Sequence, residues 1–189
     1  MESNIISKYK ICGSSIARDI GNTLKLKKTE VHPGGKIIRG PKNISSKVEQ
    51  VIANEEYAIV AIGGNDVTNN YTKNTCSENI QADYVKKIQA LINLRKRLYQ
   101  DKPGHLIIVL LTPRYLTYRP SVTNELLEIN ATIKRMISSA RGNDKKWIHW
   151  TDTRKLIDYK MLRRDEVHLT DLGNHVLAKL IIETAKRNL

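Results

Sequence analysis

The sequence predicts an α/β fold in which helices cover both faces of a five-stranded parallel sheet. Short runs rich in Ile, Val and Tyr alternate with longer segments of helical spacing. Two of the runs, YAIVAI and HLIIVLL, are almost continuously apolar, which is typical of strands buried on both faces. No repeat, low-complexity segment or linker-like stretch divides the 189 residues, so we expect a single domain over residues 1–189.

The strands are expected where the Ile, Val and Tyr residues cluster between turn-forming residues. The first strand covers residues 9–12 and stops at Gly13, where YKIC gives way to two serines. The second covers 28–32 and ends at Pro33 and two glycines. The remaining strands are expected at 57–62, 105–112 and 147–151. Right-handed crossovers between parallel strands then place helices on both faces of the sheet.

Helices are expected in the intervals between the strands and after the last one. Ser46 and Glu49 have the spacing of a capping box, so we expect a helix to begin at Lys47. Amphipathic spacing predicts further helices at 83–99, 121–140 and 170–187. Thr170 is a suitable N-cap for the last of them.

The net charge is the unusual bulk property. The chain has 32 Lys and Arg residues against 19 Asp and Glu residues, which gives a formal charge of +13. Such a charge favours polyanionic partners, namely nucleic acid, anionic lipid surfaces or acidic substrates. The basic residues are spread along the chain, however, without the interleaved aromatic residues that stack on bases. A solvated basic surface and a nucleic-acid contact therefore remain alternatives.

Two features bear on where the protein works. No apolar run approaches the roughly 20 residues needed to span a bilayer, and MESNIISKYK has no apolar segment of signal-peptide length. We therefore expect a cytoplasmic protein, unless a precursor has been trimmed.

Cys12 and Cys76 are too few for a disulfide framework and lack a metal-ligand spacing. Cys12 lies in the first apolar run and is expected to be a small buried residue.

Polar and glycine-rich groups follow several of the predicted strands. They are Gly13-Ser14-Ser15, His32-Pro33-Gly34-Gly35, Gly63-Gly64-Asn65-Asp66 and, before the last helix, Asp165-Glu166-Val167-His168. Since the carboxyl ends of parallel strands meet at one edge of a sheet, we expect all four groups to converge there.

Together these groups contain the parts needed for acyl transfer. A serine hydroxyl becomes a useful nucleophile only when a base can take its proton, and His168 is the natural base. Asp165 lies three residues earlier and can hold the other ring nitrogen of the imidazole. The backbone N–H groups of Ser15 and Gly34 and the side-chain amide of Asn65 can stabilise the resulting oxyanion.

The four groups resemble the signature blocks of the SGNH (GDSL-type) hydrolases. They read CGSSIARD, HPGGK, IGGND and DEVHLTDLGNHVLAKLI, in the family's order and over essentially the whole chain. The resemblance implies a flavodoxin-like three-layer α/β/α sandwich and a serine esterase that needs no metal or other cofactor. It also implies that Ser15 is the nucleophile, that Asp165 and His168 complete the triad, and that Gly34 and Asn65 serve the oxyanion hole.

One position departs from the family pattern. The family commonly has Gly-Asp-Ser in the first block, whereas Ser14 occupies the Asp position here. Ser14 can therefore be argued as an alternative nucleophile, but the count from Gly13 to the apolar Ile16 favours Ser15. We expect Ser14 to shape the turn instead.

Each group also has a structural interpretation. Serines after a strand often cap a helix, and Asn-Asp after glycines often forms a turn. The segment DEVHLTD is rich in possible metal ligands, but it lacks a His-x-x-x-His pair and a clear third ligand. Arg114, after the fourth strand, either binds an anionic part of the substrate or lies in a solvated loop.

A second function is compatible with the same scaffold. The wording of three blocks is also similar, more loosely, to the esterase domains of LINE-type retrotransposons and related viral proteins. The alternative to an esterase is thus a nucleic-acid-associated binding or assembly protein of a retroelement or virus, with weak or no esterase activity. The net charge is its support in the sequence.

Overall fold

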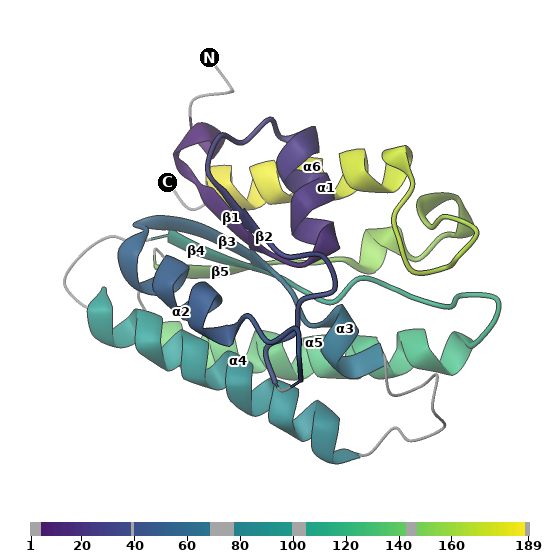
Figure 1. Ribbon diagram of the computed structural model, residues 1–189, viewed down its shortest axis with the longest axis horizontal. Helices are drawn as coiled ribbons and strands as arrows, with labels where there is room; N and C mark the ends of the chain where they lie inside the picture. The colour runs from purple at the N-terminus through teal and green to yellow at the C-terminus, as the bar shows by residue number, and fades with distance from the viewer. Residues whose placement is uncertain (1–4, 39, 69–77, 100–104, 143–146, 188–189) are drawn as a thin grey trace.

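The computed structural model of the protein describes residues 5–38, 40–68, 78–99, 105–142 and 147–187. Within them, five parallel strands form one sheet in the order β2-β1-β3-β4-β5 (Figure 1). The strands are β1 (Lys10–Gly13), β2 (Thr29–Val31), β3 (Tyr57–Ala61), β4 (His105–Val109) and β5 (Ile148–Thr151). The five-stranded parallel sheet predicted from the sequence is confirmed.

Helices cover both faces of this sheet. They are α1 (Ser15–Thr23), α2 (Ser45–Asn54), α3 (Gly64–Thr68), α4 (Glu78–Leu98), α5 (Pro120–Arg141) and α6 (Asp171–Arg187), with short 3-10 turns at Ile6–Lys8, Arg154–Leu156 and Tyr159–Met161. Figure 1 shows α1 and α6 on one face and α2, α4 and α5 on the other. The arrangement is the three-layer sandwich that the family resemblance implied.

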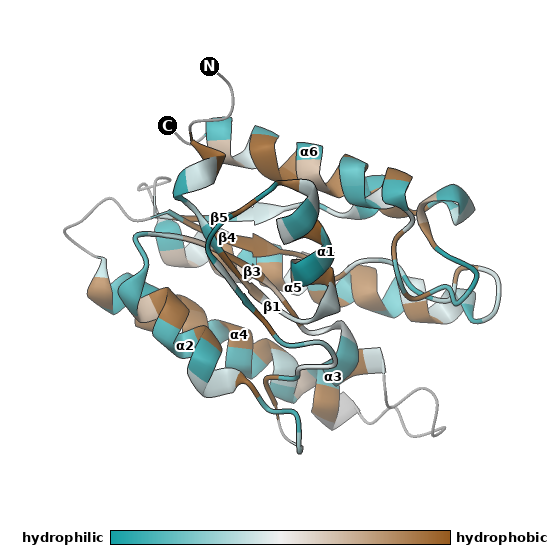
Figure 2. Cartoon of the chain, turned by 45° about the horizontal axis from the view of Figure 1, so that its top comes forward, coloured by the Kyte–Doolittle hydropathy of each residue, from teal (hydrophilic) through white to brown (hydrophobic). Residues whose placement is uncertain are grey.

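The apolar side chains of the strands divide between the two faces. In β1, Ile11 packs with the α1 and α6 layer, whereas Cys12 packs with the layer of α2, α4 and α5. Ile59 and Val60 of β3 alternate in the same way. Figure 2 shows hydrophilic (teal) and hydrophobic (brown) residues alternating along the helices, as expected of helices with one apolar face. Burial on both faces explains why the strands read as continuous apolar runs.

Cys12 is fully buried, as expected, and burial raises the pKa of its thiol to about 12. Cys76 and most of the polar loop after β3 lie outside the described residues. Among the helices that the structure describes, none combines the length and apolarity that crossing a bilayer would require.

Two helix starts test the capping expectations. Helix α2 begins at Ser45, two residues before Lys47, because the side chain of Asn43 accepts a hydrogen bond from the Ser45 N–H (2.8 Å). The prediction of a capping box at Ser46 is therefore wrong. At α6 the prediction is confirmed: Thr170 Oγ1 accepts a hydrogen bond from the Gly173 N–H (3.1 Å).

Candidate active site

Backbone hydrogen bonds join the ends of the first three strands. The N–H of His32, just after β2, donates to Gly13 O (2.9 Å), and the N–H of Ser14 donates to Ala61 O at the end of β3 (3.2 Å). Gly13 has φ +146°, and a Cβ there would collide with the carbonyl of Ala61. Glycine is therefore required where the chain turns from β1 toward α1.

The two adjacent serines occupy different environments. Ser14 is 3% exposed and precedes the helix, but its hydroxyl makes no capping hydrogen bond to α1. Its N–H bond to β3 anchors the turn, in keeping with the role expected for it. Ser15 is half-buried and is the first residue of α1, where a backbone N–H has no carbonyl of its own helix to pair with.

The segment after β2 meets the start of α3. Asn65 Nδ2 donates to the carbonyl of Gly35 (3.3 Å), so the structure brings the second and third sequence groups together. Gly34 adopts a left-handed φ of +76°, and the aliphatic stem and ammonium of Lys42 lie against its Cα. The Asn65 amide and the Gly34 backbone therefore line the same part of the sheet edge.

Asp66 of α3 holds the segment after β2 in place by hydrogen bonds to its backbone. Both of its carboxylate oxygens accept the N–H of Ile37 (2.9 and 3.1 Å), and one also accepts the N–H of Ile38 (2.9 Å). The carboxylate is 3% exposed, and this burial raises its pKa despite the hydrogen bonds from the two backbone groups. Asp66 thus braces the loop after β2.

Asp165 and His168 form a hydrogen-bonded pair before α6. His168 Nδ1 lies 2.6 Å from Asp165 Oδ2, while Asp165 Oδ1 accepts the N–H groups of Val167 (2.9 Å) and His168 (3.0 Å). Partial burial acts to raise the pKa of Asp165, but the hydrogen bonds from the imidazole and the two N–H groups outweigh it and lower the pKa to about 2. A carboxylate of this kind orients the ring and stabilises its protonated form.

The second ring nitrogen of His168 has no partner among the described residues, so it is available to a substrate or a nucleophile. Ser15 and His168 come from α1 and from the segment before α6, two helices that pack side by side on one face of the sheet (Figure 1). Within the described chain, no hydrogen bond joins the hydroxyl of Ser15 to the imidazole. Unliganded enzymes often form this bond only when substrate is present.

Glu166 connects the loop after β4 to the Asp165–His168 turn. The sequence did not predict this role of Glu166. Its carboxylate accepts the N–H groups of Thr117 (3.1 Å) and Tyr118 (3.0 Å) and the hydroxyl of Thr117, and its carbonyl accepts the N–H of Tyr115 (2.7 Å). Both Glu166 (φ +52°) and Tyr115 (φ +55°) adopt the left-handed conformation. Because the partners lie 48 to 51 residues apart, no local sequence pattern could have shown the contact.

Arg114 is buried rather than solvated. Its side chain is 7% exposed, it donates from Nη1 to Thr68 Oγ1 (2.8 Å), and its guanidinium packs against Gly64. Burial lowers its pKa to about 10, so it stays protonated near neutral pH. It therefore lies behind the glycine turn that carries Asn65.

The carboxylates of the DEVHLTD segment face different neighbours. Asp165 faces His168, and Glu166 faces the 117–118 loop. Over the ranges that the structure covers, no three His, Cys, Asp or Glu side chains are arranged to hold a metal ion.

Comparison with known proteins places this arrangement in a family. A family model described as GDSL-like lipase/acylhydrolase matches residues 9–181. Similar solved structures include an acetyl xylan esterase, AlAXEase (TM-score 0.66, 16% identity, 93% of this chain and 98% of that chain covered). A catalytic mutant of Axe2, an acetylxylan esterase from Geobacillus stearothermophilus, gives a TM-score of 0.68 at 13% identity, with 94% and 93% covered.

A lipase/acylhydrolase from Enterococcus faecalis has a TM-score of 0.62 at 15% identity, with 95% of this chain and 96% of that chain covered. A search of curated proteins finds no match. At these identities the solved structures establish the shared fold, and the family model, which spans most of the sequence, establishes membership. The chain therefore belongs to the GDSL-like lipase/acylhydrolase family, and it is an SGNH-type ester hydrolase.

Proposed function

We propose that the protein is a serine esterase that hydrolyses carboxylic (acyl or acetyl) esters through Ser15, His168 and Asp165. The oxyanion donors are the N–H groups of Ser15 and Gly34 and the side-chain amide of Asn65. The observation that carries the proposal is the Asp165–His168 pair. It is hydrogen-bonded at 2.6 Å, its second ring nitrogen has no partner among the described residues, and it lies at the same edge of the sheet as the start of α1.

In the first half of the reaction, His168 Nε2 takes the proton from the Ser15 hydroxyl as Oγ bonds to the acyl carbon. The carbonyl electron pair moves onto oxygen, and the three donors stabilise this oxyanion. When the tetrahedral intermediate collapses, the bond to the alcohol oxygen breaks and His168 returns its proton to that oxygen. The products of this half are the free alcohol and acyl-Ser15.

In the second half, a water molecule replaces the alcohol. His168 takes one proton from the water as its oxygen attacks the acyl carbon, and the second oxyanion occupies the same donors. Collapse breaks the bond to Ser15 Oγ, which regains a proton from His168. One ester and one water thus yield one carboxylic acid and one alcohol, and Asp165 stays ionised throughout because its pKa lies at about 2.

The proposal is tested with p-nitrophenyl esters of increasing acyl length and with a fluorophosphonate probe. We expect wild-type protein to turn over the short esters and to be labelled at Ser15. Ser15→Ala should lose both properties, with kcat falling by about 10⁶-fold as for other triad nucleophiles. Ser14→Ala is the matched control, and it should still be labelled.

Two results would overturn the assignment. Labelling that survives Ser15→Ala and disappears in Ser14→Ala would make Ser14 the nucleophile. A correctly folded wild-type protein that neither turns over any ester in the panel nor reacts with the probe would refute esterase activity and favour a binding protein on the same scaffold.

A further inference from the structure

We propose that Arg114 is a positioning residue that holds the oxyanion side of this site and places a fixed positive charge behind it. The inference rests on the proposed function, because it concerns how the donors of that reaction are held. It differs from the expectation that Arg114 binds the substrate.

The contacts of the guanidinium connect it to the turn that carries Asn65. Nη1 of Arg114 donates to Thr68 Oγ1 (2.8 Å), and the hydroxyl of Thr68 donates to the carbonyl of Gly64 (2.5 Å). A Cβ at Gly64 would collide with the guanidinium. Arg114 therefore contacts both ends of α3, the short helix in which Asn65 is the second residue.

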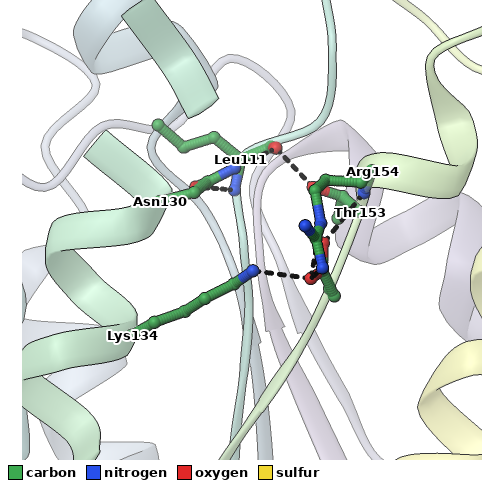
Figure 3. A network of polar contacts seen from close by, with 6 residues as sticks. Leu111, Asn130, Lys134, Thr153 and Arg154 are labelled. Carbon is green, nitrogen blue, oxygen red and sulfur yellow. Dashed lines mark hydrogen bonds and ion pairs between the residues drawn. The ribbon is translucent and has the colours of Figure 1, made fainter. Parts of the chain in front are cut away.

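The segment that carries Arg114 is itself held firmly. Thr123 Oγ1 accepts the N–H of Arg114 (3.3 Å) and donates to its carbonyl (2.9 Å). Three residues earlier, the side chain of Asn130 pairs with both backbone groups of Leu111 (2.8 and 2.9 Å), and Thr153 Oγ1 donates to the same carbonyl (2.7 Å). Figure 3 shows Asn130 and Thr153 converging on Leu111 from opposite sides. Helix α5 and the end of β5 thus fix the base from which Arg114 extends.

A direct role in substrate binding fits the surroundings poorly. Arg114 is 7% exposed, and the cavity that it lines beside Ser14 and Gly64 has a volume of about 20 Å³. Such a space admits about one water molecule, and it is too small for a sugar, a phosphate or an acyl chain. The residue therefore acts on the reaction through Gly64 and Asn65 and through its charge.

The charge is placed where it can affect the reaction. Among the described residues, Arg114 has no carboxylate in ion-pair contact. Burial lowers the pKa of its guanidinium, and the charges of Tyr115 and Asp165 act to raise it. A cation shielded from water acts over a longer range than an exposed one. It therefore favours the negative charge that develops on the oxyanion.

The test compares Arg114→Gln, which removes the charge, with Arg114→Lys, which keeps it. For Arg114→Gln we expect kcat on p-nitrophenyl acetate to fall about 10- to 100-fold, the scale reported for misplaced reacting groups, while KM stays within about twofold. Arg114→Lys keeps the charge but not the planar guanidinium, so it should recover part of the kcat that Arg114→Gln loses.

The kcat per labelled active site separates this role from general support of the fold, because unfolded protein is neither labelled nor counted. The matched control is Arg95→Gln, since Arg95 is equally buried but binds carbonyls before the start of β3, at the opposite edge of the sheet. That variant should lose stability, with kcat per active site unchanged.

Active sites are counted by fluorophosphonate labelling, so failure of the proposed function shows as an unlabelled wild type. Given labelling, the inference is overturned if Arg114→Gln keeps the wild-type kcat, or if Arg114→Lys is as slow as Arg114→Gln. If Arg114→Gln fails to fold, Arg114→Lys and Thr68→Val take its place. Both should lower kcat at constant KM, and wild-type kcat in both would refute the positioning role.

Discussion

Replacing Asp66 by alanine should uncouple the loop after β2 from α3 at a measurable cost in stability. The carboxylate accepts the N–H groups of Ile37 and Ile38, and alanine leaves both without an acceptor. Ile37 is 1% exposed, so its unpaired N–H should cost about 1–3 kcal/mol. Ile38 is half-buried and can regain water, which limits its share to about 1 kcal/mol.

The cost of burying the Asp66 carboxylate acts in the opposite direction. Burial raises the pKa of Asp66, which means that the fold holds the ionised carboxylate at some cost, and alanine removes that cost. We therefore expect Asp66→Ala to lower the free energy of unfolding by about 1–3 kcal/mol, less than the sum of about 2–4 kcal/mol for the two unpaired groups. Urea titration followed by the fluorescence of Trp147 and Trp150 measures this change. A loss below about 0.5 kcal/mol would refute the assignment, because it is the size expected of an ordinary surface substitution.

Asp66→Asn gives a check on the sign of the pKa shift. A group whose pKa is raised in the folded state contributes stability below its unfolded pKa and loses it as pH rises through the folded pKa. Asparagine cannot ionise, so the stability deficit of Asp66→Asn relative to wild type should shrink between pH 4 and pH 7. A deficit that grows over this range would mean that the backbone hydrogen bonds outweigh burial, and that the pKa is lowered instead.

Three further predictions concern Asp165 and Arg95. Asp165→Asn should reduce kcat/KM by about 10³- to 10⁴-fold through loss of the correct histidine tautomer, with little change in the urea midpoint because the Asp165 side chain is 48% exposed. Since the pKa of Asp165 is about 2, the acid limb of wild-type kcat/KM above pH 4 should have unit slope, and a slope of two would show a second titrating group. Arg95→Ala should lower the free energy of unfolding by about 3–5 kcal/mol, because the carbonyls of Ile52, Glu55 and Glu56 lose a buried charged donor. Urea titration checks this last value, and kcat per labelled site should stay unchanged.

The sequence predicted the layers of the fold better than the details at its edges. Strands buried on both faces leave a strong local signal, and YAIVAI and HLIIVLL coincide with β3 and β4. Strand β4 nevertheless ends at Val109, two residues before the apolar run does, because the side chain of Asn130 takes over the backbone groups of Leu111. Such a replacement depends on a residue 19 positions away, which no window of the sequence contains.

The candidate site shows the same division. Glycines and polar residues after strands could be placed at one edge from topology alone, and the structure brings the Gly34–Gly35 segment and Asn65 into contact there. The burial of Arg114 could not be predicted, since a charged residue in a polar loop is usually solvated. Its position depends on the glycine at residue 64, whose missing side chain makes room for the guanidinium.

The two halves of the site are built in physically different ways, and this bears on how each can be altered. The oxyanion half of the proposed site rests on buried charges, Asp66 and Arg114, each at most 7% exposed. The base half of the proposed site rests on the exposed carboxylates of Asp165 and Glu166. Water and salt can reach these groups and weaken their electrostatic interactions. Substitutions in the first half must therefore disturb stability and rate together. Those in the second can change the orientation of His168 and leave the fold intact, so the loops around this half are free to vary without loss of the scaffold.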